Sequence, residues 1–293
     1  MLDLVQSILD GVLFGATYAL IGIGFTLVFG VMHKLNLAYA AASIGGAYCG
    51  LLVMGLVEGA APAWAVFLGA FLAGGVIGYL VYLTCFHFIP LANPLATLMS
   101  TVGILLLIDE IIVHVTDGMP KNFPTMFDDE MLRAGDLTLR GDLLLIFGVS
   151  IVCMAGLLVL LYRTRLGLAT RAVSQQPVAA QLCGIRVAQV NAATFVVTGL
   201  LGGIAGALIG ASVGALSPLL TTPLTVKGLI VTVIGGLGSI PGAIVAGLLV
   251  GAFENLFQQF RGVTERDLYV MLLLFVFLVF RPGGIFAPKG SRD

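Results

Sequence analysis

The chain has 293 residues, of which 59% are hydrophobic and 10% are charged, and its mean hydropathy is +1.10. Soluble domains carry about a quarter charged residues, so 14 Lys+Arg and 15 Asp+Glu are too few to cover a soluble globule of 30.5 kDa. The formal net charge of −1 argues against the concentrated basic face that a nucleic-acid partner requires. The composition therefore predicts a polytopic membrane protein whose surroundings are a lipid bilayer.

Apolar runs follow one another along the chain, and most approach the roughly 20 residues that an α-helix needs to cross about 30 Å of hydrocarbon. They lie near residues 8–31, 37–57, 63–86, 95–116, 143–162, 190–212, 226–239, 241–259 and 268–281. We expect an all-α fold: a single transmembrane domain over residues 1–293 with about eight or nine membrane helices. The two runs within 226–259 are so close together that they predict either a helical hairpin or one broken helix.

The distribution of charge predicts the orientation of these helices. The segment 163–191 contains four arginines and no acidic residue, whereas the segment 117–142 contains three cations and six acids. The positive-inside rule places the first segment in the cytoplasm. Alternation of the spans then places the N-terminus outside and the C-terminus in the cytoplasm.

The cytoplasmic loop at about 163–190 is predicted to contain a short helix of its own. Pro177 suits the first turn of a helix, and Gly184 suits the left-handed position that ends one. The intervening residues, Ala179 to Cys183, continue the helix. Such a helix would offer an outward surface to a partner, although a simple linker between spans also allows it.

Glycine spacing predicts close packing of the helices. Four glycines recur at every fourth position and would therefore lie along one helix face: Gly202, Gly206, Gly210 and Gly214. Four further pairs share this spacing, namely Gly11/Gly15, Gly46/Gly50, Gly238/Gly242 and Gly247/Gly251. With 39 glycines in the chain, chance and helix packing explain an isolated pair equally well, whereas the fourfold series favours packing.

Several motifs that would indicate catalysis or cofactor binding are absent or out of context. Residues 210–214 match G-x-S-x-G, but that motif requires a strand-to-helix turn beside a histidine and an acid. The four cysteines lack C-x-x-C spacing, and the chain contains no G-x-x-x-x-G-K-[ST] phosphate loop. We therefore expect no enzyme, no catalytic residue, no metal site and no cofactor bound by this chain.

Polar and ionisable residues within the apolar runs are candidates for a solute path, because burying a charge in a membrane is costly and often functional. The acids Asp109, Glu110 and Glu254 lie toward predicted external ends, where they either reach the interface or line the path. The full set of pathway candidates is Asn36, Tyr39, Ser43, Thr97, Thr101, Thr232 and Glu254. For any single Ser or Thr, a hydrogen bond to a nearby backbone carbonyl is the ordinary alternative.

Four stretches together resemble the permease subunits of ABC importers for branched-chain amino acids, a group that also serves urea, amides and other small amphipathic solutes. They are LFGATYALIGIGFTLVFGVMHKLNLAYAAASIGGAY at 13–48, RAVSQQPVAAQLCGI at 171–185, VIGGLGSIPGAIVAGLLVGAFEN at 233–255 and RPGGIF at 281–286. Their order and spacing cover nearly the whole chain.

The resemblance implies a complex in the cell inner membrane. It contains this permease, a second paralogous or identical permease, two cytoplasmic P-loop ATPases that bind ATP and Mg, and a periplasmic solute-binding protein. The coupling segment that contacts the ATPases would comprise Arg171, Gln175, Gln176, Pro177, Ala179 and Ala180. The glycines Gly235, Gly236 and Gly238 would allow a helix break and a close crossing in the membrane core.

One departure from the family pattern concerns specificity. Amino-acid permeases commonly read Asn-Phe-Ala-His-Gly-Glu where this chain reads NLAYAA at 36–41. Asn36 is kept, but Tyr39 and Ala41 replace the histidine and the acid. If this stretch contacts the solute, the resemblance leaves open a shift from branched-chain or other amino acids toward an amide, urea, or an aromatic or organic acid.

Two other functional classes compete with the importer subunit. A stand-alone secondary transporter or channel would need its own coupling-ion site, for which Asp109, Glu110 and Glu254 are the available acids. An intramembrane enzyme is the weakest alternative, because no nucleophile is paired with a base in the sequence.

Overall fold

The structure is a computed structural model that describes residues 2–56, 62–89, 94–124, 131–134, 137–262, 265–281 and 283–286. Its long helices are α1 (Leu2–Met32), α2 (Ala38–Leu56), α3 (Ala63–Tyr82), α4 (Pro94–Thr116), α5 (Gly141–Arg163), α8 (Val187–Val213), α9 (Thr221–Gly235), α10 (Ile240–Arg261) and α11 (Arg266–Phe280). Shorter helices are α6 (Arg165–Gln175), α7 (Pro177–Leu182), a π-helical turn at Leu83–His87 and a 3₁₀ turn at Pro218–Leu220.

The predicted membrane fold is confirmed, because every predicted apolar run falls on a long helix. Within the described ranges, seven helices are long and apolar enough to cross a membrane, and Ala38–Leu52 of α2 forms a shorter apolar helix. The last predicted run corresponds to α11, which has 15 residues. The structure adds four short strands that the sequence did not predict: β1 (Lys121–Asn122), β2 (Met131–Ala134), β3 (Leu137–Arg140) and β4 (Ala215–Leu216).

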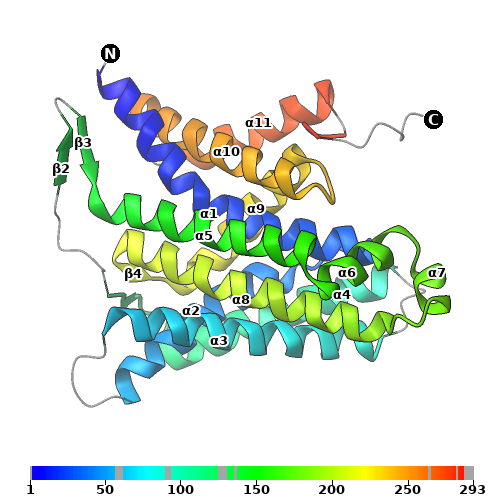
Figure 1. The fold of residues 1–293 in the computed structure, drawn as a ribbon. Helices are drawn as coiled ribbons and strands as arrows, with labels where there is room; N and C mark the ends of the chain where they lie inside the picture. The colour runs from blue at the N-terminus through cyan, green and yellow to red at the C-terminus, as the bar shows by residue number, and fades with distance from the viewer. Residues whose placement is uncertain are drawn as a thin grey trace.

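The strands lie at one end of the helical bundle and α7 lies at the other (Figure 1). β2 and β3 form an antiparallel hairpin, and β1 pairs with β4 so that Lys121 lies opposite Leu216. Helix α1 begins at the end of the bundle that carries β2 and β3 (Figure 1). Most of the helix axes therefore run between two distinct faces, as a membrane-spanning bundle requires.

The two runs within 226–259 form a helical hairpin of α9 and α10. The connecting turn uses glycines with positive φ, 99° at Gly236 and 87° at Gly238, which a side chain would strain. Ser239 then caps α10 by accepting a hydrogen bond of 3.3 Å from Gly242 N. A methyl group at Gly235 would lie 2.5 Å from the carbonyl carbon of Gly242, so the two helices meet backbone to backbone at the turn.

Helix α1 runs through the centre of the bundle. Its apolar window is 83% buried, compared with 17% for α4, and α10 packs against it along most of its length. Two glycine pairs make this approach possible: a methyl group would lie 2.6 Å from Gly251 O if added at Gly11, and 2.8 Å from Gly247 O if added at Gly15. The four-residue spacing of Gly11/Gly15 and Gly247/Gly251 therefore reflects helix packing and not chance.

The fourfold glycine series on α8 serves two purposes. Gly202 and Gly206 face α2, where a methyl group on Gly206 would collide with the backbone carbonyl of Ser43. Gly210 faces Phe123, whose ring would lie 2.9 Å from an added methyl group. Gly214 was predicted to pack against a helix, and that is wrong: it has φ 73°, ends α8, and no atom lies within 4 Å of a methyl group placed on it.

A prediction follows for this packing. Replacing Gly206 with Leu should lower the melting temperature and the yield of folded protein, because overpacking costs about 1–3 kcal/mol even where side chains can adjust and here the obstacle is backbone. The matched control is Gly156→Leu on α5, where a methyl group would meet nothing within 4 Å. Thermal denaturation of both detergent-solubilised variants provides the measurement, and equal melting temperatures would contradict the packing assigned to Gly206.

Candidate functional site

The residue that departs from the family pattern, Tyr39, fills a slot between α1 and α8. Its side chain is 2% exposed, and its ring lies edge-on to Phe25 with the ring centres 5.1 Å apart. A methyl group on Gly24 would collide with the tyrosine ring, and one on Gly202 would lie 3.2 Å from its hydroxyl. The two glycines thus create the space that the tyrosine occupies.

The neighbours of Tyr39 on α2 also point into the bundle. Ser43 donates a 2.9 Å hydrogen bond to the carbonyl of Tyr39, the ordinary role of a serine in a span. Asn36 is 4% exposed, and its Oδ1 accepts no hydrogen bond within the described part of the chain. Tyr39 and Ser43 lie one turn apart on α2, whereas Asn36 precedes the helix, which begins at Ala38. None of the three lines a cavity described below.

The remaining threonine candidates lie on other helices. Thr97 and Thr101 are buried on α4, and Thr101 donates to the carbonyl of Leu98 at 2.7 Å. Thr232 on α9 donates to Gly228 O at 2.8 Å and to Gly22 O at 3.2 Å, so it connects α9 to α1. The structure does not gather the seven pathway candidates into one surface, and none of them lines a cavity described below.

Glu254 lies at the centre of an ion network, and it lines none of the cavities described below. Its side chain is 4% exposed, and its Oε1 is 2.8 Å from Lys227 Nζ and 2.9 Å from Arg266 Nε. Tyr18 donates a 3.0 Å hydrogen bond to the same oxygen. Lys227 is also 3.2 Å from Asp267.

The network joins four helices, because Tyr18 is on α1, Lys227 on α9, Glu254 on α10, and Arg266 and Asp267 begin α11. Two cations and two carboxylates cancel one another's charge, which lowers the cost of placing them in the bundle. Sequence reasoning missed Lys227. Lys227 is a single cation inside an otherwise apolar run, and this pattern predicts an acidic partner on a neighbouring helix.

The other two intramembrane acids lie on α4. Glu110 is exposed and Asp109 is partly buried, and both line a cleft of 590 Å³ between α4 and the start of α9. Gly103 and Thr222 also line this cleft. Nowhere in the described ranges do three or more His, Cys, Asp or Glu side chains converge as a metal site would require.

The predicted short helix at the α7 end of the bundle is confirmed. It begins at Pro177 and ends at Leu182, followed by Gly184 with φ 84°. The expectation that Ala180 points outward is wrong, because Ala180 is 4% exposed and packs inside its own chain. The outward apolar residues are Val178 and Leu182, which are 68% and 86% exposed.

The segment before α7 was predicted as a loop and instead forms helix α6. Thr164 caps it by accepting a 3.1 Å hydrogen bond from Gly167 N. Arg171 lies 5.2 Å from the centre of the Tyr162 ring and lines a 470 Å³ cavity between α1, α5, α6 and the α9–α10 turn. The other predicted coupling residues, Gln175, Gln176, Pro177 and Ala179, are exposed around α7.

The ion network yields a second prediction. Glu254→Gln and Lys227→Met should each destabilise the protein by less than the roughly 3–5 kcal/mol of an isolated buried pair, because Lys227 keeps its contact with Asp267 and Glu254 keeps its contact with Arg266. The double variant should lose less than the sum of the two single losses, since the residues interact directly. Thermal denaturation of the three solubilised variants measures this coupling, and strictly additive losses would show that the pair contributes nothing as a pair.

Comparison with known proteins places this geometry in a family. Residues 7–280 match the family model described as the permease component of the branched-chain amino acid transport system. The chain is 30% identical over 291 residues to the high-affinity branched-chain amino acid permease protein BraD of Pseudomonas aeruginosa, covering 96% of this chain and 94% of that protein. It is 28% identical to the Escherichia coli permease LivH over 293 residues, with the same coverage.

A solved structure supports the fold independently. It is an inward-facing conformation of a metal-chelate type ABC transporter, with a TM-score of 0.50 and 17% sequence identity, and the match covers 94% of this chain and 87% of that chain. At this identity the likeness concerns the fold alone. Together with the family match and the apolar helices, it identifies the chain as a multi-pass membrane protein that belongs to the branched-chain amino acid transport system permease family.

Proposed function

We propose that this chain is the permease subunit of an ABC importer in the cell inner membrane, which forms part of the path for a small amphipathic solute. A branched-chain or other amino acid is the first choice, in keeping with the names of its relatives. Other members of the complex are a second permease, two cytoplasmic ATPases that bind ATP and Mg, and a periplasmic solute-binding protein. The N-terminus is external and the C-terminus cytoplasmic.

The observation that carries this proposal is the position and surface of α7. The helix lies at one end of the bundle (Figure 1), and its residues Val178 and Leu182 present apolar side chains to the outside although the surrounding loop is polar. Positions i and i+4 lie on one helix face, so the two side chains form a single contact patch. Exposed apolar residues beyond a membrane span favour a protein partner.

The alternative of an ion-coupled secondary transporter loses support from the ion network. Of the three intramembrane acids available to bind a coupling ion, Glu254 already contacts Lys227 and Arg266. Asp109 and Glu110 remain on α4, but only as a pair beside a cleft. The importer proposal needs no coupling ion, because partner subunits supply the energy.

A third prediction tests the coupling contact. Leu182→Asp should insert and fold normally but abolish co-purification with the ATPase subunits, or solute-stimulated ATP hydrolysis in the reconstituted complex, because it places a charge in an apolar contact. The control is Leu219→Asp, which changes a leucine that is 81% exposed at the opposite end of the bundle. Wild-type association and hydrolysis in Leu182→Asp would eliminate α7 as the ATPase contact.

A fourth prediction concerns the solute. Tyr39 lines no described cavity in this conformation, so a role in specificity requires the solute path to open between α1 and α8 during transport. Tyr39→His should then change the relative uptake of branched-chain amino acids and aromatic acids by about tenfold, in line with the 1–3 kcal/mol that small changes in a binding pocket contribute. Tyr39→Phe is the control, because it still fills the slot beside Gly24 and Gly202. Uptake by proteoliposomes containing the assembled importer provides the measurement, and an unchanged ratio would remove Tyr39 from the determinants of specificity.

A further inference from the structure

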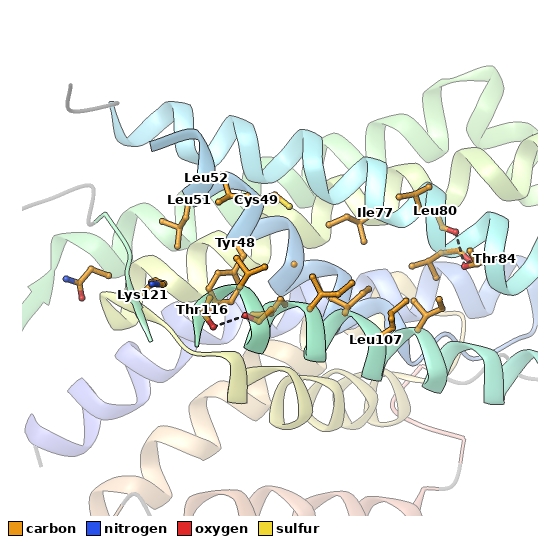
Figure 2. A pocket seen from close by; sticks show the side chains of 18 residues that line it. Tyr48, Cys49, Leu51, Leu52, Ile77, Leu80, Thr84, Leu107, Thr116 and Lys121 are labelled. Carbon is orange, nitrogen blue, oxygen red and sulfur yellow. Dashed lines mark hydrogen bonds between the residues drawn. The ribbon is translucent and has the colours of Figure 1, made fainter. Parts of the chain in front are cut away.

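A cavity with a volume of 790 Å³ lies between α2, α3 and α4 (Figure 2). Most of its wall consists of aliphatic side chains from these three helices. Figure 2 shows them pointing toward one another from the three helices, with Lys121 near one end of the cavity and Thr84 near the other. Representative wall residues are Leu52, Ile77, Leu80, Leu107, Ile108 and Ile111.

The hydroxyl groups in the wall are already hydrogen-bonded to backbone carbonyls. Tyr48 donates to Leu216 O at 2.8 Å, Thr116 to Ile112 O at 2.7 Å, and Thr84 to Leu80 O at 2.9 Å. An amino acid would bring an ammonium and a carboxylate into this cavity, and burying such charges without partners is unfavourable. The wall therefore suits an apolar occupant better than the proposed solute.

The α4 wall of the cavity is long enough to hold the acyl chain of a lipid in one leaflet. Its α4 wall extends from Ile104 to Thr116, and a rise of 1.5 Å per residue makes this stretch about 18 Å long. One leaflet contributes about 15 Å of hydrocarbon, half of the 30 Å total. Lys121 is in β1, which pairs with β4 at the end of the bundle opposite α7 (Figure 1). An acyl chain that enters the cavity beside Lys121 therefore belongs to the leaflet opposite α7, and the wall continues beyond it to Thr84.

The cavity opens to the outer surface of the chain. Leu80 on α3 and Leu107 and Ile111 on α4 all line it, yet each is more than half exposed. Its strand-bearing end carries Lys121, an exposed cation that forms no ion pair with any described residue. An apolar slot with a cation at its strand-bearing end complements the acyl chain and phosphate of a phospholipid.

We propose that this cavity binds one acyl chain of a phospholipid from the leaflet opposite α7, with the lipid phosphate at Lys121. The lipid fills the gap between α3 and α4, whose own contact is slight. It thereby supports α4, the least buried of the candidate spans. This site is separate from the proposed solute path, and it stands even if the transported solute is another compound.

The test uses the assembled importer, purified in mild detergent and equilibrated with phosphatidylglycerol that carries a photoactivatable diazirine at mid-chain. After illumination, mass spectrometry maps the labelled peptides. We expect labelling of the cavity segments 77–84 and 104–115 to exceed that of the lipid-facing helix α11 about tenfold, equivalent to ~1.4 kcal/mol of preferential binding.

Three variants make the test specific. Ile108→Trp fills the cavity and should reduce the labelling of these segments about tenfold, whereas Met99→Trp, which lies on α4 outside the cavity and is 61% exposed, should leave it unchanged. Lys121→Gln keeps the cavity intact and should weaken phosphatidylglycerol retention about fivefold, the contribution of one cation near a membrane surface.

Uniform labelling of α4 and α11 would overturn the proposal, because it would indicate ordinary surrounding lipid. Unchanged labelling in a folded Ile108→Trp variant would overturn it as well. If Ile108→Trp fails to fold, the Lys121→Gln result decides: retention equal to that of the wild type contradicts the site. Absence of labelling in the assembled importer would show that another subunit occupies the cavity, which also contradicts the proposal.

Discussion

The structure depends on close backbone contact between helices. Lipid tails are as apolar as leucine side chains, so burial of apolar surface does not drive helices together inside a membrane, and packing must do so. The glycines at positions 11 and 15 allow α10 to reach α1, and Gly206 allows α2 to reach α8. Once α1 is surrounded in this way, each remaining helix has fixed neighbours. The polar residues on these helices then lie opposite one another.

The ion network shows how the close helix contacts bring charged residues from different helices together. Lys227 and Glu254 lie on the two arms of one hairpin, and Tyr18 reaches them from α1 because the glycine contacts bring α10 against that helix. Their charges are paired with one another inside the protein. The surfaces that we propose to be functional lie elsewhere: at α7, which is exposed beyond the bundle, and along α4, which is only slightly covered by its own chain.

The sequence was sufficient to predict the long apolar helices, because long apolar runs leave a chain in lipid few alternatives, but it missed the polar helix α6. It also located α7 from Pro177 and Gly184, two residues with distinct backbone preferences. It could not show that Ala180 faces inward, since a six-residue helix carries too little periodicity to orient. The partner of Glu254 was equally hidden, because Lys227 is 27 positions away and only the hairpin geometry brings the two together.

The hairpin also has a consequence for how the protein is made. A lone lysine near the middle of a helix opposes membrane insertion by about 2.5–3.5 kcal/mol, and α9, with a mean hydropathy of 1.5, is the least apolar of the seven spans. The tight turn at Gly236 and Gly238 holds α10 within reach while α9 leaves the translocation machinery. Biogenesis should therefore release the two helices into the bilayer as one unit, with Lys227 and Glu254 already paired.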